Sequence, residues 1–184
     1  MTTVQPDHLR TLLLGTMQID LASRRAAEAA VENLKATPGF ASSLCRLCLD
    51  AAQPLELRQL SALILKQFVK VHWNPPDDED DLNDATTAAT TINVCDEEKA
   101  AVRAALPSGL TDPAPRIRTA VSMAIASVAQ WDWPDEWPDL MRHLIGPLEA
   151  SCSSSSSSSS SSSADESVAV AGVLRCLELC APEL

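Results

Sequence analysis

Apolar residues recur at every third or fourth position along most of the chain, which is the spacing of amphipathic α-helices. No convincing run alternates strictly between apolar and polar residues, so the pattern gives β-strands no place. The helical segments fall into pairs over residues 7–37, 39–73, 96–131 and 134–181. The sequence therefore predicts an all-α protein of four helical hairpins.

Start and stop signals place the helices of the first two hairpins. Asp20 can cap the second helix, and Pro38-Gly39 stops it. The fourth helix begins after Pro54. Its predicted apolar face consists of Leu57, Leu60, Ile64, Phe68 and Val71.

Similar signals recur in the second half. The acids Asp96, Glu97 and Glu98 favour the positive end of a helix dipole and mark a helix start. A break at residues 107–109 precedes a partner helix, and Gly146-Pro147 is expected to disturb the end of the next helix. The last helix is predicted to carry Val168, Ala171, Leu174 and Leu177 on its apolar stripe.

Two segments lack the helical pattern. Residues 74–95 are acidic and then rich in Thr and Ala, with too few large apolar groups to fold alone, so a long loop is predicted. Residues 151–167 contain a serine run, a composition typical of a flexible linker. We interpret the serine run as a disordered insertion.

The hairpins form a weak internal repeat. Arg24, Arg58 and Arg118 each occupy an early turn of a second helix, at separations typical of helical repeats once the acidic loop is set aside. Stacked helix pairs bury a continuous core, so the expected shape is an α-solenoid with a right-handed superhelix. Spacing alone leaves armadillo and tetratricopeptide repeats as alternatives to HEAT repeats.

Charge narrows the classes of partner. The chain has 14 Lys and Arg against 25 Asp and Glu, a formal net charge of −11. Affinity for a phosphate backbone needs clustered Lys and Arg, so direct nucleic-acid binding is not expected. A basic protein partner fits better, although net charge also serves plain solubility.

Hydropathy argues against a membrane protein. No apolar run approaches the roughly 20 residues that span a bilayer, and the first residues lack the basic start and apolar core of a secretory signal. We expect an intracellular protein without membrane insertion.

Neither the cysteines nor any catalytic motif indicates a metal site or an active site. Cys45, Cys48, Cys176 and Cys180 could be assembled into four zinc ligands, but they lie among the leucines of apolar stripes, where reduced cysteine is a small buried hydrophobe. The sequence has no Gly-rich phosphate loop and no nucleophile beside a recognisable base. It therefore predicts no metal, no cofactor and no enzyme.

Two passages are more specific than helical periodicity. One runs from Leu57 to Val69 and is followed by His72-Trp73, and the other runs from Val121 to Leu140 with Asp-Trp-Pro-x-x-Trp-Pro inside it. Together with the break at 106–110, they resemble the N-terminal domain of the importin-β family over roughly residues 20–149. Gln67 departs from the family's usual Asn.

The resemblance implies the N-terminal part of a much longer nuclear import receptor, a karyopherin built from HEAT repeats. Such a receptor binds protein cargo, releases it when the small GTPase Ran in the GTP form docks on the first repeats, and shuttles between cytoplasm and nucleus. It also implies basic cargo such as histones or ribosomal proteins, and nucleoporin contacts through parts absent from this chain. A HEAT-repeat structural adaptor that never meets Ran is the alternative.

In such solenoids the second helices line the concave face, so their polar stripes supply the candidate sites. The candidate Ran contacts are Arg58, Gln59, Lys66, Gln67, Lys70, Arg118 and Ser122. The candidate cargo contacts are Asp77, Asp78, Glu79, Asp80 and Asp81. The residues interpreted as structural are Trp73, Trp131, Trp133, Pro134 and Trp137.

Overall fold

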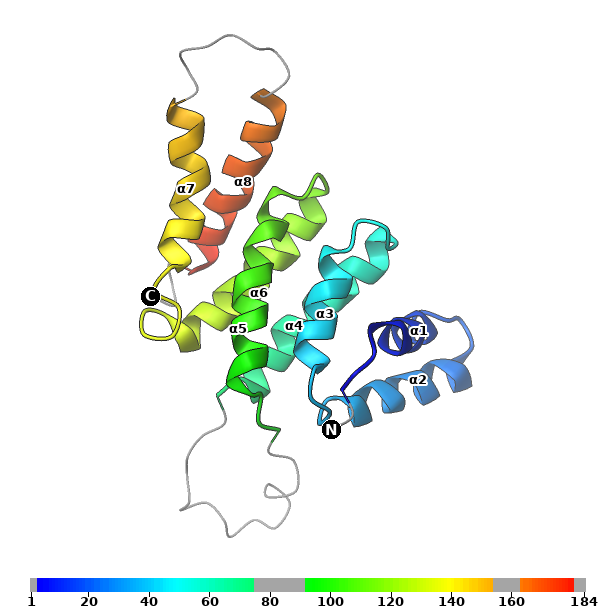
Figure 1. Ribbon diagram of the computed structural model, residues 1–184. Helices are drawn as coiled ribbons and strands as arrows, with labels where there is room; N and C mark the ends of the chain where they lie inside the picture. Colours follow the sequence, from blue (N-terminus) through cyan, green and yellow to red (C-terminus); the bar gives the residue numbers. More distant parts are fainter. Residues whose placement is uncertain (1–2, 75–91, 154–162, 181–184) are drawn as a thin grey trace. The chain divides into compact units, whose positions relative to one another are not determined.

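The computed structural model describes residues 3–74, 92–153 and 163–180. Throughout these ranges the regular structure is helical, which confirms the all-α prediction (Figure 1). The chain divides into two compact units, Met1–Val102 and Arg103–Leu184. The right-handed sense expected of the superhelix stays a prediction.

Two helical hairpins make up most of the first unit. They comprise α1 (Pro6–Thr16), α2 (Leu21–Leu34), α3 (Phe40–Leu49) and α4 (Leu55–His72). α1 packs against α2, α3 packs against α4, and α1 also contacts both helices of the second hairpin. Asp20 caps α2 as predicted, because its Oδ2 accepts a hydrogen bond from the Ser23 N–H at 2.8 Å. Hydrogen bonding with the Ser23 side chain and with its N–H lowers the pKa of the Asp20 carboxyl.

Leucine and aromatic side chains fill the core of the first unit. The large side chains that are fully buried there are Leu9, Leu13, Phe40, Leu44, Leu57, Leu65 and Trp73. Burying one such side chain stabilises the fold by about 1.5–3 kcal/mol relative to leaving it exposed. The rings of Phe40 and Phe68 lie 5.1 Å apart and join α3 to α4. Between the hairpins, Arg10 Nε donates to Gln53 Oε1 at 2.8 Å.

The buried face of α4 differs from the predicted one. The buried positions are Leu57, Arg58, Ser61, Ala62, Leu65, Phe68 and Val69. Leu60 and Ile64 are only half-buried, and Val71 is 56% exposed. Apolar residues cover more than half of the circumference of α4, so their period alone does not decide which side meets α3 and α1. Ser61 tolerates burial because its hydroxyl donates to the Leu57 carbonyl at 2.8 Å.

The second unit also consists of helices. The chain reaches it through α5 (Asp96–Ala105), and continues with the 3₁₀ helix η2 (Leu106–Thr111), α6 (Pro115–Asp132), α7 (Leu140–Ser153) and α8 (Ser163–Cys180). η2 occupies the predicted break after α5 and packs against α6. α8 packs against α6, α7 and η2, so α6 and α8 form the centre of this unit.

A buried ion pair anchors the end of α6. Arg103 Nη1 lies 2.8 Å from Asp132 Oδ2, with 13% of the Arg103 and 6% of the Asp132 side chain exposed. The Asp132 carbonyl also accepts hydrogen bonds from the N–H groups of Glu136 and Trp137. Asp132 thus connects the end of α5, the end of α6 and the turn that follows.

Two predictions about the last hairpin are wrong. Gly146-Pro147 does not end the helix, because α7 continues to Ser153; a proline removes one N–H donor, and a helix can bend and continue past it. The predicted disordered insertion, 151–167, is too long, since 151–153 belong to α7 and 163–167 to α8. Its middle, 154–162, lies outside the described residues.

The packed face of α8 is also displaced from the predicted stripe. Leu174 is 55% exposed, whereas Val173, Cys176 and Cys180 are buried. Apolar side chains surround most of this helix, so its neighbours decide which of them are covered. Gly172 allows the close approach, because a Cβ there would collide with the Leu110 carbonyl oxygen of η2.

The buried cysteines behave as core residues. Cys45, Cys48, Cys176 and Cys180 are reduced and buried, and burial raises the pKa of Cys45 to about 12. Within the described ranges, no group of three or more His, Cys, Asp or Glu is placed to hold a metal ion. Nor does any described helix combine the length and hydrophobicity needed to cross a bilayer.

Candidate protein-binding surface

One face of α4 presents polar side chains to solvent. Three- and four-residue steps connect five residues and place them on one side of the helix: Gln59, Leu63, the adjacent pair Lys66 and Gln67, and Lys70. Gln67 and Lys70 are exposed, Gln59 and Lys66 are partly exposed, and Leu63 is 42% exposed. We call these five residues the α4 face.

The two lysines of the α4 face are free to meet a partner. In the part of the chain that the structure describes, neither Lys66 nor Lys70 forms a hydrogen bond or an ion pair. Lys70 lies in the last turn of α4, where a positive charge is favoured by the helix dipole. The face therefore offers two ammonium groups beside two amides and a leucine, a mixture suited to an acidic protein surface.

Arg58 does not belong to this face. Its side chain is 5% exposed, and its Nε donates to the Cys48 carbonyl at 2.9 Å. That carbonyl is one of the last four of α3, which lack partners within their own helix. Arg58 thus caps α3 from inside the hairpin and is not presented to a partner.

The candidates on α6 are also occupied by internal contacts. Arg118 Nη1 donates to the carbonyls of Asp112 at 2.7 Å and Pro113 at 3.1 Å. Ser122 is fully buried, and its hydroxyl lies 2.8 Å from the Arg118 carbonyl and 3.4 Å from that of Gly172. Both residues thus use their polar groups to hold the second unit together.

The tryptophans predicted to be structural divide into two groups. Trp73 is fully buried and Trp137 is 4% exposed, so both pack in the core. Trp131 is 42% exposed, which contradicts its predicted place in the core. Trp133 is half-buried, and the Trp133-Pro134 peptide bond is cis with Pro134 exposed. At the end of α6 only Trp137 turns inward, since it follows the tight turn at Asp132.

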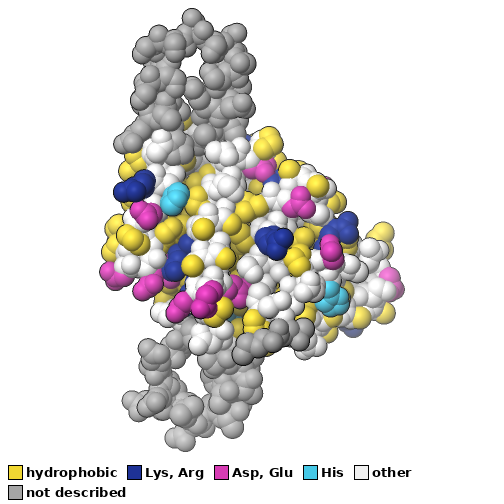
Figure 2. Space-filling model, viewed as in Figure 1, with side chains coloured by type: hydrophobic (Ala, Val, Ile, Leu, Met, Phe, Trp, Pro, Cys, Tyr) yellow, Lys and Arg dark blue, Asp and Glu magenta, His cyan; other side chains and the backbone are white. Residues whose placement is uncertain are grey.

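The candidate cargo contacts Asp77, Asp78, Glu79, Asp80 and Asp81 lie outside the described residues. On the face drawn in Figure 2, Lys and Arg side chains stand apart from one another and do not gather into a patch.

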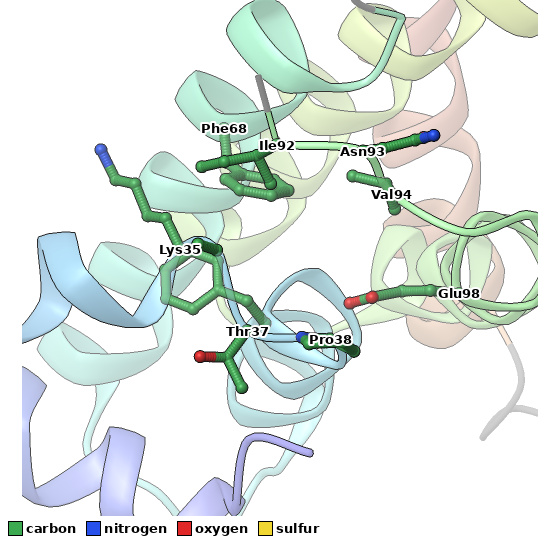
Figure 3. Close-up of a pocket in the computed structure, with 10 residues that line it drawn as sticks. Lys35, Thr37, Pro38, Phe68, Ile92, Asn93, Val94 and Glu98 are labelled. Atoms are coloured by element: carbon green, nitrogen blue, oxygen red, sulfur yellow. The ribbon is translucent and has the colours of Figure 1, made fainter. Parts of the chain in front are cut away.

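A small pocket lies at the end of the first unit's second hairpin. Its walls come from the α2–α3 turn, α3, α4 and residues 92–98, with an empty volume of about 240 Å³ that includes space open to solvent (Figure 3). Phe68 and Ile92 line the pocket, and the ammonium of Lys35 points away from it. The volume of the cavity itself is about 30 Å³, far below the roughly 300–1,000 Å³ that small-molecule sites usually enclose, so this pocket does not point to a ligand site.

Two features of the site escape a reading of the sequence. Leu63 is not among the residues that the apolar pattern places on a face of α4, although its spacing from Gln59 and Lys66 is helical. The sequence predicts Glu98 only as an acid at the start of its own helix, yet its carboxylate accepts hydrogen bonds from Gly39 and Ser42 at the start of α3. No local pattern announces that second contact.

Comparison with known proteins shows a likeness to one protein family. Residues 27–112 match the family model described as Importin-beta N-terminal domain. Importin-9 of Drosophila melanogaster is 29% identical over 128 residues, which cover 70% of this chain and 12% of that protein. The chain therefore spans a small part of the length of this relative.

Solved structures show the same architecture. Lph2, a bidirectional nuclear transport receptor of S. cerevisiae, superimposes with a TM-score of 0.70 and 19% identity over 94% of this chain and 15% of its own. A structure of Kap95p gives a TM-score of 0.62 and 21% identity over 97% of this chain and 23% of its own. At these identities the likeness shows the fold, that of the HEAT-repeat solenoids.

Proposed function

We propose that this chain, whose residues 27–112 match the family model of the importin-β N-terminal domain, is the N-terminal part of a longer nuclear import receptor whose first repeats bind Ran in the GTP form. The observation that carries the proposal is the α4 face. Lys66 and Lys70 extend from the second helix of the second hairpin, and neither has an ion-pair partner among the described residues.

A structural neighbour supports the choice of Ran. Kap95p, which shares this fold, induces the switch loops of RanGDP to adopt the GTP-bound conformation. For our chain we propose the same class of partner, bound through Gln59, Lys66, Gln67 and Lys70. Arg58, Arg118 and Ser122 are left out of this proposed contact set, because their polar groups bond within the chain.

We propose the class of cargo from the net charge of the chain. A formal net charge of −11 attracts basic proteins such as histones or ribosomal proteins over distances of about a Debye length, near 8 Å at physiological salt. We further propose that the whole receptor meets nucleoporins through repeats beyond this chain, and that it shuttles between cytoplasm and nucleus.

The test is binding to Ran locked in its GTP form. Replacing both lysines, Lys66→Gln with Lys70→Gln, is expected to weaken the affinity about tenfold, because two charge contacts at an interface are removed. Titration by isothermal calorimetry, with Ran in the GDP form alongside, measures the effect.

A matched control removes the same charge elsewhere. Arg46→Gln with Arg142→Gln changes two exposed arginines on α3 and α7, and leaves the α4 face intact. This variant is expected to bind GTP-form Ran like the wild-type chain. Equal weakening by both pairs would show a nonspecific charge effect, and an absence of binding by the longer receptor would favour a HEAT-repeat adaptor that Ran does not regulate.

A further inference from the structure

Glu98 caps a helix to which it does not belong. Its Oε2 accepts a hydrogen bond from the Gly39 N–H at 2.8 Å, and its Oε1 accepts one from the Ser42 N–H at 2.9 Å. Gly39 is the N-cap residue of α3, in the left-handed region at φ 88°, and has no side chain of its own to accept these bonds. The carboxylate of α5 therefore supplies the capping acceptor that the start of α3 lacks.

The next residue holds the end of α4. Lys99 Nζ lies 5.8 Å from the centroid of the Trp73 ring, a distance that permits cation–π attraction. Trp73 is the C-cap residue of α4 and is fully buried. Two consecutive side chains of α5 thus contact the start of α3 and the C-cap residue of α4.

These two contacts meet at the open end of one hairpin. α3 and α4 are antiparallel neighbours joined by a short turn, so the start of α3 and the end of α4 lie at the end opposite that turn (Figure 1). Figure 3 shows the same place, with the Glu98 carboxylate directed toward the α2–α3 turn at Pro38. The rings of Phe40 and Phe68 contact each other there at a tilt of 57°, and Val94 is 4% exposed.

We infer that Glu98 and Lys99 form a clamp that fixes the last turns of α4 and so positions Lys66 and Lys70 for their partner. This inference rests on the proposed function of the α4 face. Lys70 lies three residues before Trp73, in the turn of a helix that frays most readily. A clamped end presents both ammonium groups in one arrangement before binding, which lowers the conformational cost of association.

The experiment compares Glu98→Ala with Glu97→Ala in the full chain. Both changes remove one acid from the first turn of α5, but only Glu98 contacts α3. Amide hydrogen exchange at Gly39 and Ser42 is expected to accelerate about tenfold in Glu98→Ala and to stay unchanged in Glu97→Ala. Lys99→Met, which keeps the length of the side chain, provides a second variant that leaves the α3 cap in place.

Binding to GTP-form Ran then tests the positioning role. Glu98→Ala and Lys99→Met are each expected to weaken affinity by about threefold to tenfold. In the background of Lys66→Gln with Lys70→Gln, the same changes are expected to cause no further loss, because the clamp acts through those lysines. If Glu98 and Lys99 had a purely structural role, their substitutions would cause a further loss of affinity that adds to the loss caused by the lysine substitutions.

The outcomes separate this inference from the function on which it rests. Faster exchange with unchanged affinity, or additive losses, overturns the positioning role. If the wild-type chain does not bind Ran, the proposed function fails, and the clamp is judged by exchange alone. Unchanged exchange at Gly39 and Ser42 in Glu98→Ala overturns the clamp in either case.

Discussion

Arg58 shows how a single charged residue can belong to the core. An arginine on a helix with other basic residues is ordinarily expected in solvent, yet its side chain is 5% exposed. The stem packs between α3 and α4, and the guanidinium bonds to the Cys48 carbonyl at 2.9 Å. Its contribution is to the stability of the hairpin.

Replacing Arg58 should therefore destabilise the protein. Arg58→Met keeps most of the stem and removes the hydrogen-bonding head, with an expected loss of about 1–3 kcal/mol in the free energy of unfolding. Urea denaturation followed by circular dichroism measures it. Arg46→Met, on the exposed side of α3, is the control and should change stability by less than about 0.5 kcal/mol. Equal losses in the two variants would contradict the capping role.

At the scale of the helices, the close approach of one helix to another depends on small residues. α8 reaches η2 and α6 because Gly172 has no side chain, and its carbonyl lies 3.4 Å from the Ser122 hydroxyl. Gly15 plays a similar part where α1 meets α2, since a Cβ there would lie 2.9 Å from the Ala27 Cβ. Helix packing in both units thus depends on where a glycine falls.

Two glycine substitutions should have opposite effects. Gly172→Ala would place its Cβ against the Leu110 carbonyl and 3.2 Å from Arg118 Cδ, so overpacking should cost about 1–3 kcal/mol. Gly146→Ala in α7 meets nothing within 4 Å and should stabilise by up to about 1 kcal/mol, since alanine favours a helix. Thermal denaturation of both variants tests the pair. A stable Gly172→Ala would show that α8 is less closely packed than described.

At the scale of the whole molecule, charge dominates solution behaviour. An excess of 11 negative charges makes copies of the chain repel one another at neutral pH. The same excess is the basis for the basic cargo that we propose.

Lowering the pH should remove this protection. The sequence pI is about 4.6, so net repulsion vanishes as carboxylates take up protons near that pH, and self-association should be greatest there. Light scattering between pH 7 and pH 4 measures the trend. The variant with Lys66→Gln and Lys70→Gln should reach its maximum at lower pH, because it has two fewer positive charges. A maximum that does not move would mean that association follows unfolding and not net charge.

Much of the helical framework follows from local sequence. Asp20 caps α2, Pro38-Gly39 separates α2 from α3, and Pro115 opens α6, because capping and breaking act over a few neighbouring residues. The exposed lysines of α4 follow from the same helical geometry. Apolar periodicity also predicts the helices correctly in places where the predicted and observed helix ends differ.

Which side of each helix is buried was decided only by the tertiary structure. α4 buries Leu57, Ser61 and Leu65 and leaves Leu60 and Ile64 half-buried, because α1 and α3 pack against α4. Glu98 reaches α3 across more than fifty residues of sequence. The local sequence determines backbone conformation through short-range sterics and hydrogen bonds. Burial and capping by distant residues depend instead on neighbours that only the folded chain brings together.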